Sequence, residues 1–131
     1  MFRNLGYGLL LMFFVLPSVQ ADAIGETIGR GFANPALADA RLRINMNDDQ
    51  KSQFDATIAR YRKDLDAMVR KVIRTAGTRY EQELRRKNGI LVKKMDKQMA
   101  GLLRADQLPL YESYRDLLNE SISLKCRNLR C

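Results

Sequence analysis

The sequence predicts an all-α protein organised around a long bent helical hairpin with additional short helices. The first observation is an apolar stripe over 46–88 in which every step is three or four positions, which places it on one face of a helix. The second is that the same period resumes over 90–103, after a short Asn-Gly pair, so the second segment folds back antiparallel on the first. The stripe consists of Phe54, Ile58, Tyr61, Leu65, Val69, Val72, Ala76, Tyr80 and Leu84.

Residues 1–21 are typical of a secretory signal peptide. Arg3 supplies the positive start, Leu9 to Leu16 form the apolar run, and small side chains stand at the −3 and −1 positions before a cleavage point after Ala21. The run is too short to span a bilayer, which favours a cleaved signal over the alternative of a retained anchor. The short positive start fits a bacterial protein, so we expect export to the periplasm.

Residues 22–46 contain three glycines and Pro35, a composition that favours a flexible, mostly disordered N-terminal arm. One short helix is expected within it, over Ala36–Ile44, because Pro35 is suited to the position just ahead of a first helical turn. The alternative is that Phe32 and Leu37 dock on the body of the protein.

A helical domain is expected over 47–125. Asn47 can cap the first long helix, and Gln50 completes a capping box. Gly77 costs about 1 kcal/mol relative to alanine inside a helix and indicates a bend. The pair Asn88-Gly89 is the stronger stop signal, because both residues tolerate the left-handed conformation that ends helices, so we expect the hairpin turn there.

The final helix is expected to begin near Asp106, with Pro109 tolerated in its first turn. A tail over 126–131 carries the only cysteines, Cys126 and Cys131. In an oxidising compartment these two pair most simply with each other, and intermolecular pairing or reactive thiols are the alternatives. Residues five apart on a continuous helix cannot be bridged, so an internal disulfide requires the tail to leave the helix.

The net charge of +8 is concentrated in one part of the chain. Between Lys51 and Arg104 there are 15 basic and 6 acidic residues, against 8 and 9 in the rest. This balance indicates acidic or anionic partners for the long hairpin. The basic residues that we single out as candidate client-binding positions are Arg60, Arg62, Lys63, Arg70, Lys71, Arg74, Arg85, Arg86 and Lys87, and the alternative for each is an ordinary solvated helix face.

Several chemistries are excluded by composition. The chain has no histidine, and its two cysteines lie at the C-terminus, so it has neither a Ser-His-Asp or Cys-His constellation nor the residues of an ordinary His/Cys zinc site. We therefore expect no enzyme, no cofactor and no metal. Nucleic acid is disfavoured as a partner, because the basic residues are interleaved with acids and the chain is expected to be exported.

A weak repeat marks the two helix starts. Met46-Asn47-Asp48-Asp49-Gln50, followed by Phe54, aligns with Leu103-Arg104-Ala105-Asp106-Gln107, followed by Tyr111, 57 residues later. Both read as apolar-x-x-Asp-Gln-x-x-x-aromatic. One interpretation is two similar helix N-termini that arose by chance. The other is a family motif, whose residues in this chain are Met46, Asn47, Gln50, Leu103 and Gln107.

On these residues the chain resembles the Spy/CpxP family, small exported basic helical proteins with two Leu-Thr-x-x-Gln motifs at helix starts. Gln50, Leu103 and Gln107 match the pattern, whereas Met46 replaces leucine, and Asn47 and Arg104 stand where threonine is usual. The resemblance implies a hairpin that dimerises into a thin curved cradle. Some relatives bind zinc or nickel through histidines, which this chain lacks.

The resemblance and the charge together predict an ATP-independent periplasmic chaperone that loosely binds unfolded or stress-damaged envelope proteins on a basic, partly apolar helical surface. Expected partners are unfolded or acidic proteins and a second copy of the chain, with peripheral contact to an anionic membrane as a further option. Adaptable Met68, Met95 and Met99 suit varied clients, although methionines at helical spacing are also ordinary core residues. The alternative function is an adaptor that binds one periplasmic partner, such as a sensor-kinase domain, in envelope-stress signalling.

Overall fold

The computed structural model describes residues 25–122, and over this range the protein is all-α, as predicted. A helix over 25–32 is followed by α2 (Pro35–Arg43), α3 (Asp48–Thr75), the short 3-10 turn η1 (Gly77–Arg79), α4 (Tyr80–Leu102) and α5 (Leu108–Ile122). The expected signal peptide over 1–21 and the cysteine pair Cys126 and Cys131 lie outside the described residues. No helix within 25–122 is long and apolar enough to cross a membrane.

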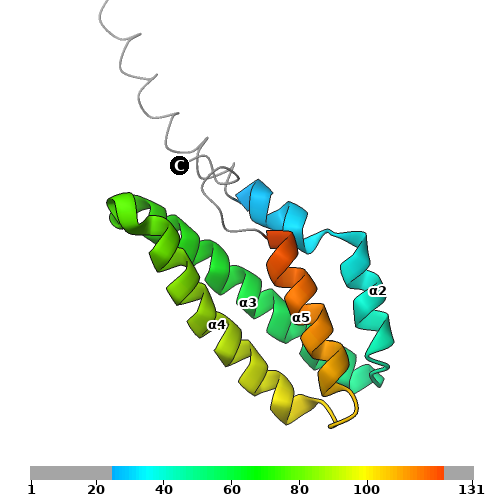
Figure 1. Ribbon diagram of the computed structural model, residues 1–131. Helices are drawn as coiled ribbons and strands as arrows, with labels where there is room; N and C mark the ends of the chain where they lie inside the picture. The colour runs from blue at the N-terminus through cyan, green and yellow to red at the C-terminus, as the bar shows by residue number, and fades with distance from the viewer. Residues whose placement is uncertain (1–24, 123–131) are drawn as a thin grey trace, which may run out of the picture.

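α3 and α4 lie antiparallel as the predicted hairpin, α5 lies across one face of it, and α2 packs against α5 (Figure 1). The core is where these helices meet: the ring of Phe54 on α3 packs edge-on against Tyr114 of α5, with ring centroids 5.2 Å apart. Leu84 and Met99 of α4 and Leu118 of α5 are fully buried. All nine residues of the predicted stripe are buried or pack against this core. The burial of the stripe is therefore confirmed, but its placement on one continuous helix is wrong, because Tyr80 and Leu84 lie on α4, beyond the turn.

The turn of the hairpin is at Gly77, so its expected position at Asn88-Gly89 is wrong. α3 ends at Thr75, Gly77 adopts φ +56°, and α4 continues unbroken through Asn88 and Gly89. The side chain of Asn88 explains the difference, because its Oδ1 accepts a hydrogen bond of 2.7 Å from the hydroxyl of Tyr61 on α3. Packing between the two helices outweighs the local preference of an Asn-Gly pair to end a helix.

Two glycine substitutions distinguish the turn from the helix interior. Gly89→Ala is expected to raise the free energy of unfolding by about 0.5–1 kcal/mol, because Gly89 lies inside α4 with open space where a Cβ would be added. Gly77→Ala is expected to lower it by about 1–2 kcal/mol, because alanine is strained at positive φ. Urea denaturation followed by circular dichroism measures both. The reverse pair of signs would contradict a turn at Gly77.

The expected disordered arm is also wrong for the described residues 25–46. This segment buries Ile28, Leu37 and Ile44, each at most 4% exposed, and the stated alternative of docking through Phe32 and Leu37 is what the structure shows. The short helix expected over Ala36–Ile44 is present as α2. Apolar residues spaced along this segment supply enough burial to order it, despite its glycines.

A close approach explains one of those glycines. A Cβ added to Gly31 would lie 2.9 Å from the Cα of Ile122 and 3.0 Å from the carbonyl oxygen of Ser121, at the end of α5. Nearby, the side-chain amide of Asn34 donates a 2.8 Å hydrogen bond to the hydroxyl of Ser121. The N-terminal helices are therefore attached to the C-terminal end of α5.

Candidate functional site

The two motif glutamines meet at the base of the hairpin. Gln50 Nε2 donates to Gln107 Oε1 at 2.9 Å, and Gln107 Nε2 donates to Gln50 Oε1 at 3.2 Å. This reciprocal amide pair is buried, with Gln50 8% and Gln107 1% exposed. We call these two residues the glutamine pair.

Each glutamine also donates to a carbonyl at the end of the helix that leads into the other motif copy. Gln50 Nε2 donates to the carbonyl of Leu102, the last residue of α4, at 3.3 Å. Gln107 Nε2 donates to the carbonyl of Asn45, just after α2, at 3.1 Å. Asn45 and Leu102 are 57 residues apart, as are Gln50 and Gln107. The two hydrogen bonds to these carbonyls are therefore related by the sequence repeat. Carbonyls at helix ends lack partners within the helix, and the glutamine pair supplies them.

The same glutamines hold the starts of the following helices. The capping box predicted at Asn47 is confirmed: Asn47 Oδ1 accepts from the Gln50 backbone N–H at 2.8 Å, and Gln50 Oε1 accepts from the Asn47 N–H at 3.1 Å. In the second copy Gln107 Oε1 accepts from the Arg104 N–H at 2.9 Å. Arg104 contributes only its backbone there, and its side chain pairs with Asp106 at 3.2 Å. The second copy thus keeps the hydrogen bond from the glutamine side chain to the N-cap backbone N–H, which does not need a threonine at the N-cap.

Apolar residues of both motif copies enclose the glutamine pair. Met46 and Leu103, which precede the two caps, are buried, and the rings of Phe54 and Tyr111 meet edge-on with centroids 6.4 Å apart. Hydrogen bonds in such surroundings are stronger than in water, and an unmet one costs more. The motif therefore acts in this protein as a structural junction of α2, α3, α4 and α5.

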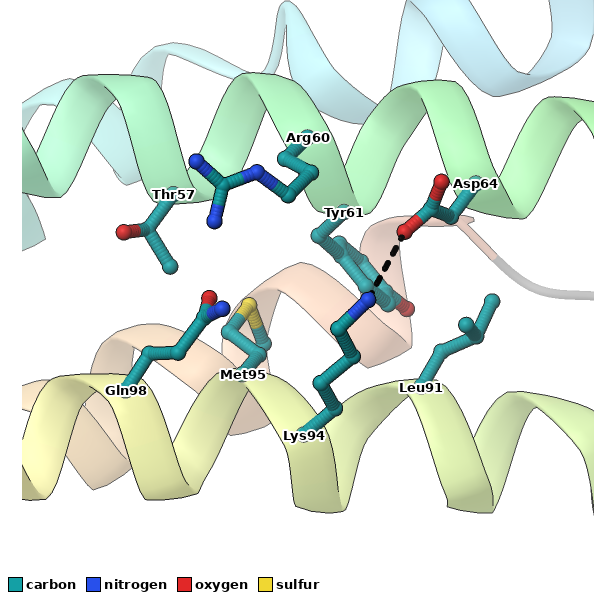
Figure 2. A pocket seen from close by; sticks show the side chains of 8 residues that line it. All are labelled: Thr57, Arg60, Tyr61, Asp64, Leu91, Lys94, Met95 and Gln98. Carbon is teal, nitrogen blue, oxygen red and sulfur yellow. Dashed lines mark ion pairs between the residues drawn. The ribbon is translucent and has the colours of Figure 1, made fainter.

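One accessible part of the hairpin is the face turned away from α5, which we call the open face. Figure 2 shows this face, with α5 behind the two helices. A narrow groove between them is lined by Thr57, Arg60, Tyr61, Asp64, Leu91, Lys94, Met95 and Gln98. It continues toward the glutamine pair as an open pocket of ≈ 350 Å³ that reaches Gln53, Gly101 and Leu102.

Cations line the open face on both helices. Lys94 Nζ lies 3.7 Å from Asp64 Oδ2 across the groove, whereas Arg60 forms no ion pair with any residue of 25–122 (Figure 2). Lys71 follows Asp64 by seven residues and Lys87 precedes Lys94 by seven, so helical periodicity places both on this face. Arg60, Lys71, Lys87 and Lys94 thus accompany Asp64 on this face, with Glu83 near Lys87. The exposed 3.7 Å pair is weak and leaves Lys94 available.

The floor of the groove is apolar. Met95 is buried and Leu91 is half-buried, while the ring of Tyr61 lies beneath them with its hydroxyl bonded to Asn88. Burial raises the pKa of Tyr61 well above its ordinary value of 10.0, so its hydroxyl stays a neutral donor at physiological pH. Met95 and Met99 are core residues, which is the alternative stated for the methionines, and Met68 is half-buried against the core.

The nine candidate client-binding cations do not share one surface. Arg60, Lys71 and Lys87 lie on the open face, while Arg62, Lys63 and Arg70 line a separate groove beside the 25–32 helix. The remaining three are exposed: Arg86 pairs with Glu83 at 3.0 Å, which lowers the pKa of that carboxyl, and Arg74 and Arg85 have no ion-pair partner within 25–122. Sequence reasoning missed Lys94, although its seven-residue spacing from Lys87 was a usable signal.

Within 25–122 no group of three or more potential metal-ligating side chains comes together. Comparison with known proteins gives no match to any protein-family model, curated protein or solved structure. The resemblance to the Spy/CpxP family therefore rests on the motif residues and stays a prediction.

Proposed function

We propose that the protein is an ATP-independent periplasmic chaperone that binds unfolded or stress-damaged envelope proteins on the open face of its hairpin. The observation that carries this proposal is that Arg60 and Lys94 line a groove with an apolar floor, with Lys71 and Lys87 further along the same helix faces by periodicity. Such a surface attracts acidic segments from a distance and then contacts their apolar side chains.

The shape of the groove supports loose rather than tight binding. Its floor is formed by Met95, which is 2% exposed, and by half-buried Leu91, so little apolar area is offered to a client. Hydrophobic binding energy scales with the apolar area removed from water, at roughly 25 cal/mol per Å². Contact with any one client is therefore brief, which is the property a chaperone without nucleotide-driven release needs. In the proposed homodimeric cradle, two copies of the open face present a longer surface.

The test is an aggregation assay with two unrelated denatured clients and no nucleotide. The wild-type protein is expected to suppress aggregation of both at a few-fold molar excess. A variant with Arg60, Lys71, Lys87 and Lys94 changed to glutamine is expected to need at least roughly fivefold more protein for the same effect, because the long-range attraction is lost. The measurement is light scattering over time.

The matched control removes the same charge from elsewhere on the hairpin. Arg74, Arg85, Lys93 and Lys97 are all exposed, and changing them to glutamine is expected to leave suppression close to wild type. Equal losses in the two variants would show that net charge, and not the open face, determines binding. Failure of the wild-type protein to protect either client would contradict the chaperone proposal and leave the adaptor that binds one fixed partner.

A further inference from the structure

A second groove, which the proposed chaperone function does not use, lies on another side of α3. It has a volume of ≈ 380 Å³ and is bounded by α3 and the 25–32 helix. We call it the side groove. Its lining residues are Gly25, Ile28, Ala59, Arg62, Lys63, Asp66 and Arg70.

Two guanidinium groups are held over the glycine face of the 25–32 helix. Arg70 Nη2 lies 3.0 Å from where a Cβ of Gly25 would be, and Arg62 Nη2 lies 3.3 Å from the corresponding point at Gly29. The two glycines are four residues apart, so at about 1.5 Å per residue these points are separated by roughly 6 Å along the helix. At this spacing both guanidinium groups can donate N–H···O bonds of about 2.9 Å to oxygens of the same tetrahedral anion.

The charges of the side groove are not neutralised. Arg70 pairs with Asp66 at 2.9 Å, but Arg62 and Lys63 donate no hydrogen bond to any residue within 25–122. Arg62 instead stacks over the ring of Phe32, with its Cζ 5.3 Å from the ring centroid. Stacking fixes the plane of the guanidinium and leaves its edge free to donate. Three cations therefore face one acid.

We propose that the side groove binds a phosphate group. Paired guanidinium forks suit the several oxygens of phosphate better than the single edge of a carboxylate, and the net charge of the groove matches a dianion. The volume is at the small end of the range for ligand sites, and Ile28 and Ala59 supply apolar lining beside the cations. These features fit a phosphomonoester that carries a small organic group, such as glycerol phosphate, free or as a lipid headgroup.

The probe is glycerol 3-phosphate, titrated into the purified protein and followed through the side-chain Nε–H resonances of arginine. Saturable shifts are expected in wild type. The double variant Arg62→Gln, Arg70→Gln is expected to weaken binding by roughly tenfold or more, because two charge-assisted contacts are lost. Ala59→Leu keeps every charge, fills part of the groove from an exposed helical position, and is expected to weaken binding as well.

The control double variant Arg74→Gln, Arg85→Gln removes equal charge outside the side groove and is expected to bind like wild type. Equal weakening in both double variants, or unchanged binding in Ala59→Leu, would overturn the proposal. Vesicles that contain phosphatidic acid distinguish the source: binding that the side-groove variants lose assigns a lipid headgroup, and binding of glycerol 3-phosphate alone assigns a soluble phosphate. Aggregation suppression is expected to persist in Ala59→Leu, so the two proposals fail independently.

Discussion

Replacing Gln107 with alanine is expected to lower the free energy of unfolding by about 3 kcal/mol, or roughly 10–20 °C in Tm for a domain of this size. Gln107 is 1% exposed, and its amide takes part in four hydrogen bonds. The substitution leaves a cavity, removes one of the two hydrogen bonds at each amide atom of Gln50, and takes the side-chain partner from the Arg104 N–H and the Asn45 carbonyl. Urea denaturation followed by circular dichroism measures the change.

A double-mutant cycle tests whether the glutamine pair acts as a unit. Gln50→Ala is expected to be destabilising by itself, and the double variant is expected to cost at least about 1 kcal/mol less than the two single losses combined, because the second substitution removes a group already without its partner. Gln98→Ala on the open face is the control, with an expected effect within about 0.5 kcal/mol. Additive losses at Gln50 and Gln107 would contradict the paired geometry.

Replacing Gly31 with valine is expected to cost about 2–3 kcal/mol and to detach the 25–32 helix from α5. Even a Cβ would lie 2.9 Å from the Cα of Ile122, and backbone atoms of a packed helix cannot move aside as a flexible side chain would. The branched side chain adds two further atoms in the same place. Hydrogen exchange measures the local change, as faster exchange of the 25–32 amides, and urea denaturation measures the global loss.

Gly101→Ala is the matched control for Gly31, because an added Cβ there meets no atom within 4 Å. It is expected to leave the free energy of unfolding unchanged or to raise it by up to about 1 kcal/mol. A Gly31→Val variant as stable as wild type, with slow exchange over 25–32, would contradict the close packing of this helix on α5.

The parts of the fold that were predictable depend on repeated local signals. The apolar stripe from Phe54 to Leu84 appears at every turn, so the long helices could be predicted from spacing alone. The position of the turn depends on packing between α3 and α4, including the contact from Tyr61 to Asn88, which no local pattern contains. Gly77 was identified as a bend, but choosing it over Asn88-Gly89 as the hairpin turn required knowledge of how the two helices pack.

The N-terminal segment shows how one residue type supports opposite interpretations. Glycines at 25, 29 and 31 indicated flexibility, yet Gly31 allows close contact with α5 and the other two lie beneath arginine side chains. A high glycine content indicates that a segment has conformational freedom. It does not show which neighbouring residues pack into the space that glycine leaves without a side chain. Phe32 and Leu37 were the residues that indicated docking, and Ile28, which sequence reasoning missed, is buried as well.

The candidate site was predictable residue by residue but not as an arrangement. The repeat identified Gln50 and Gln107, whereas their direct pairing joins positions 57 residues apart and needs the hairpin to bring them together. The basic run was also visible, but neighbours such as Arg60 and Arg62 point to different sides of α3, since successive residues on a helix differ by about 100°.

The reciprocal glutamine pair also constrains how this sequence can evolve. Gln50 Oε1 accepts from Gln107 and from the Asn47 N–H at its own helix start, and Gln50 Nε2 donates to Gln107 and to the Leu102 carbonyl at the other helix junction. A substitution at either position alone leaves the remaining buried amide without two of its hydrogen bonds, whereas a joint change removes both amides together. In sequences descended from the same ancestor we expect positions 50 and 107 to covary, while the exposed cations between them diverge freely.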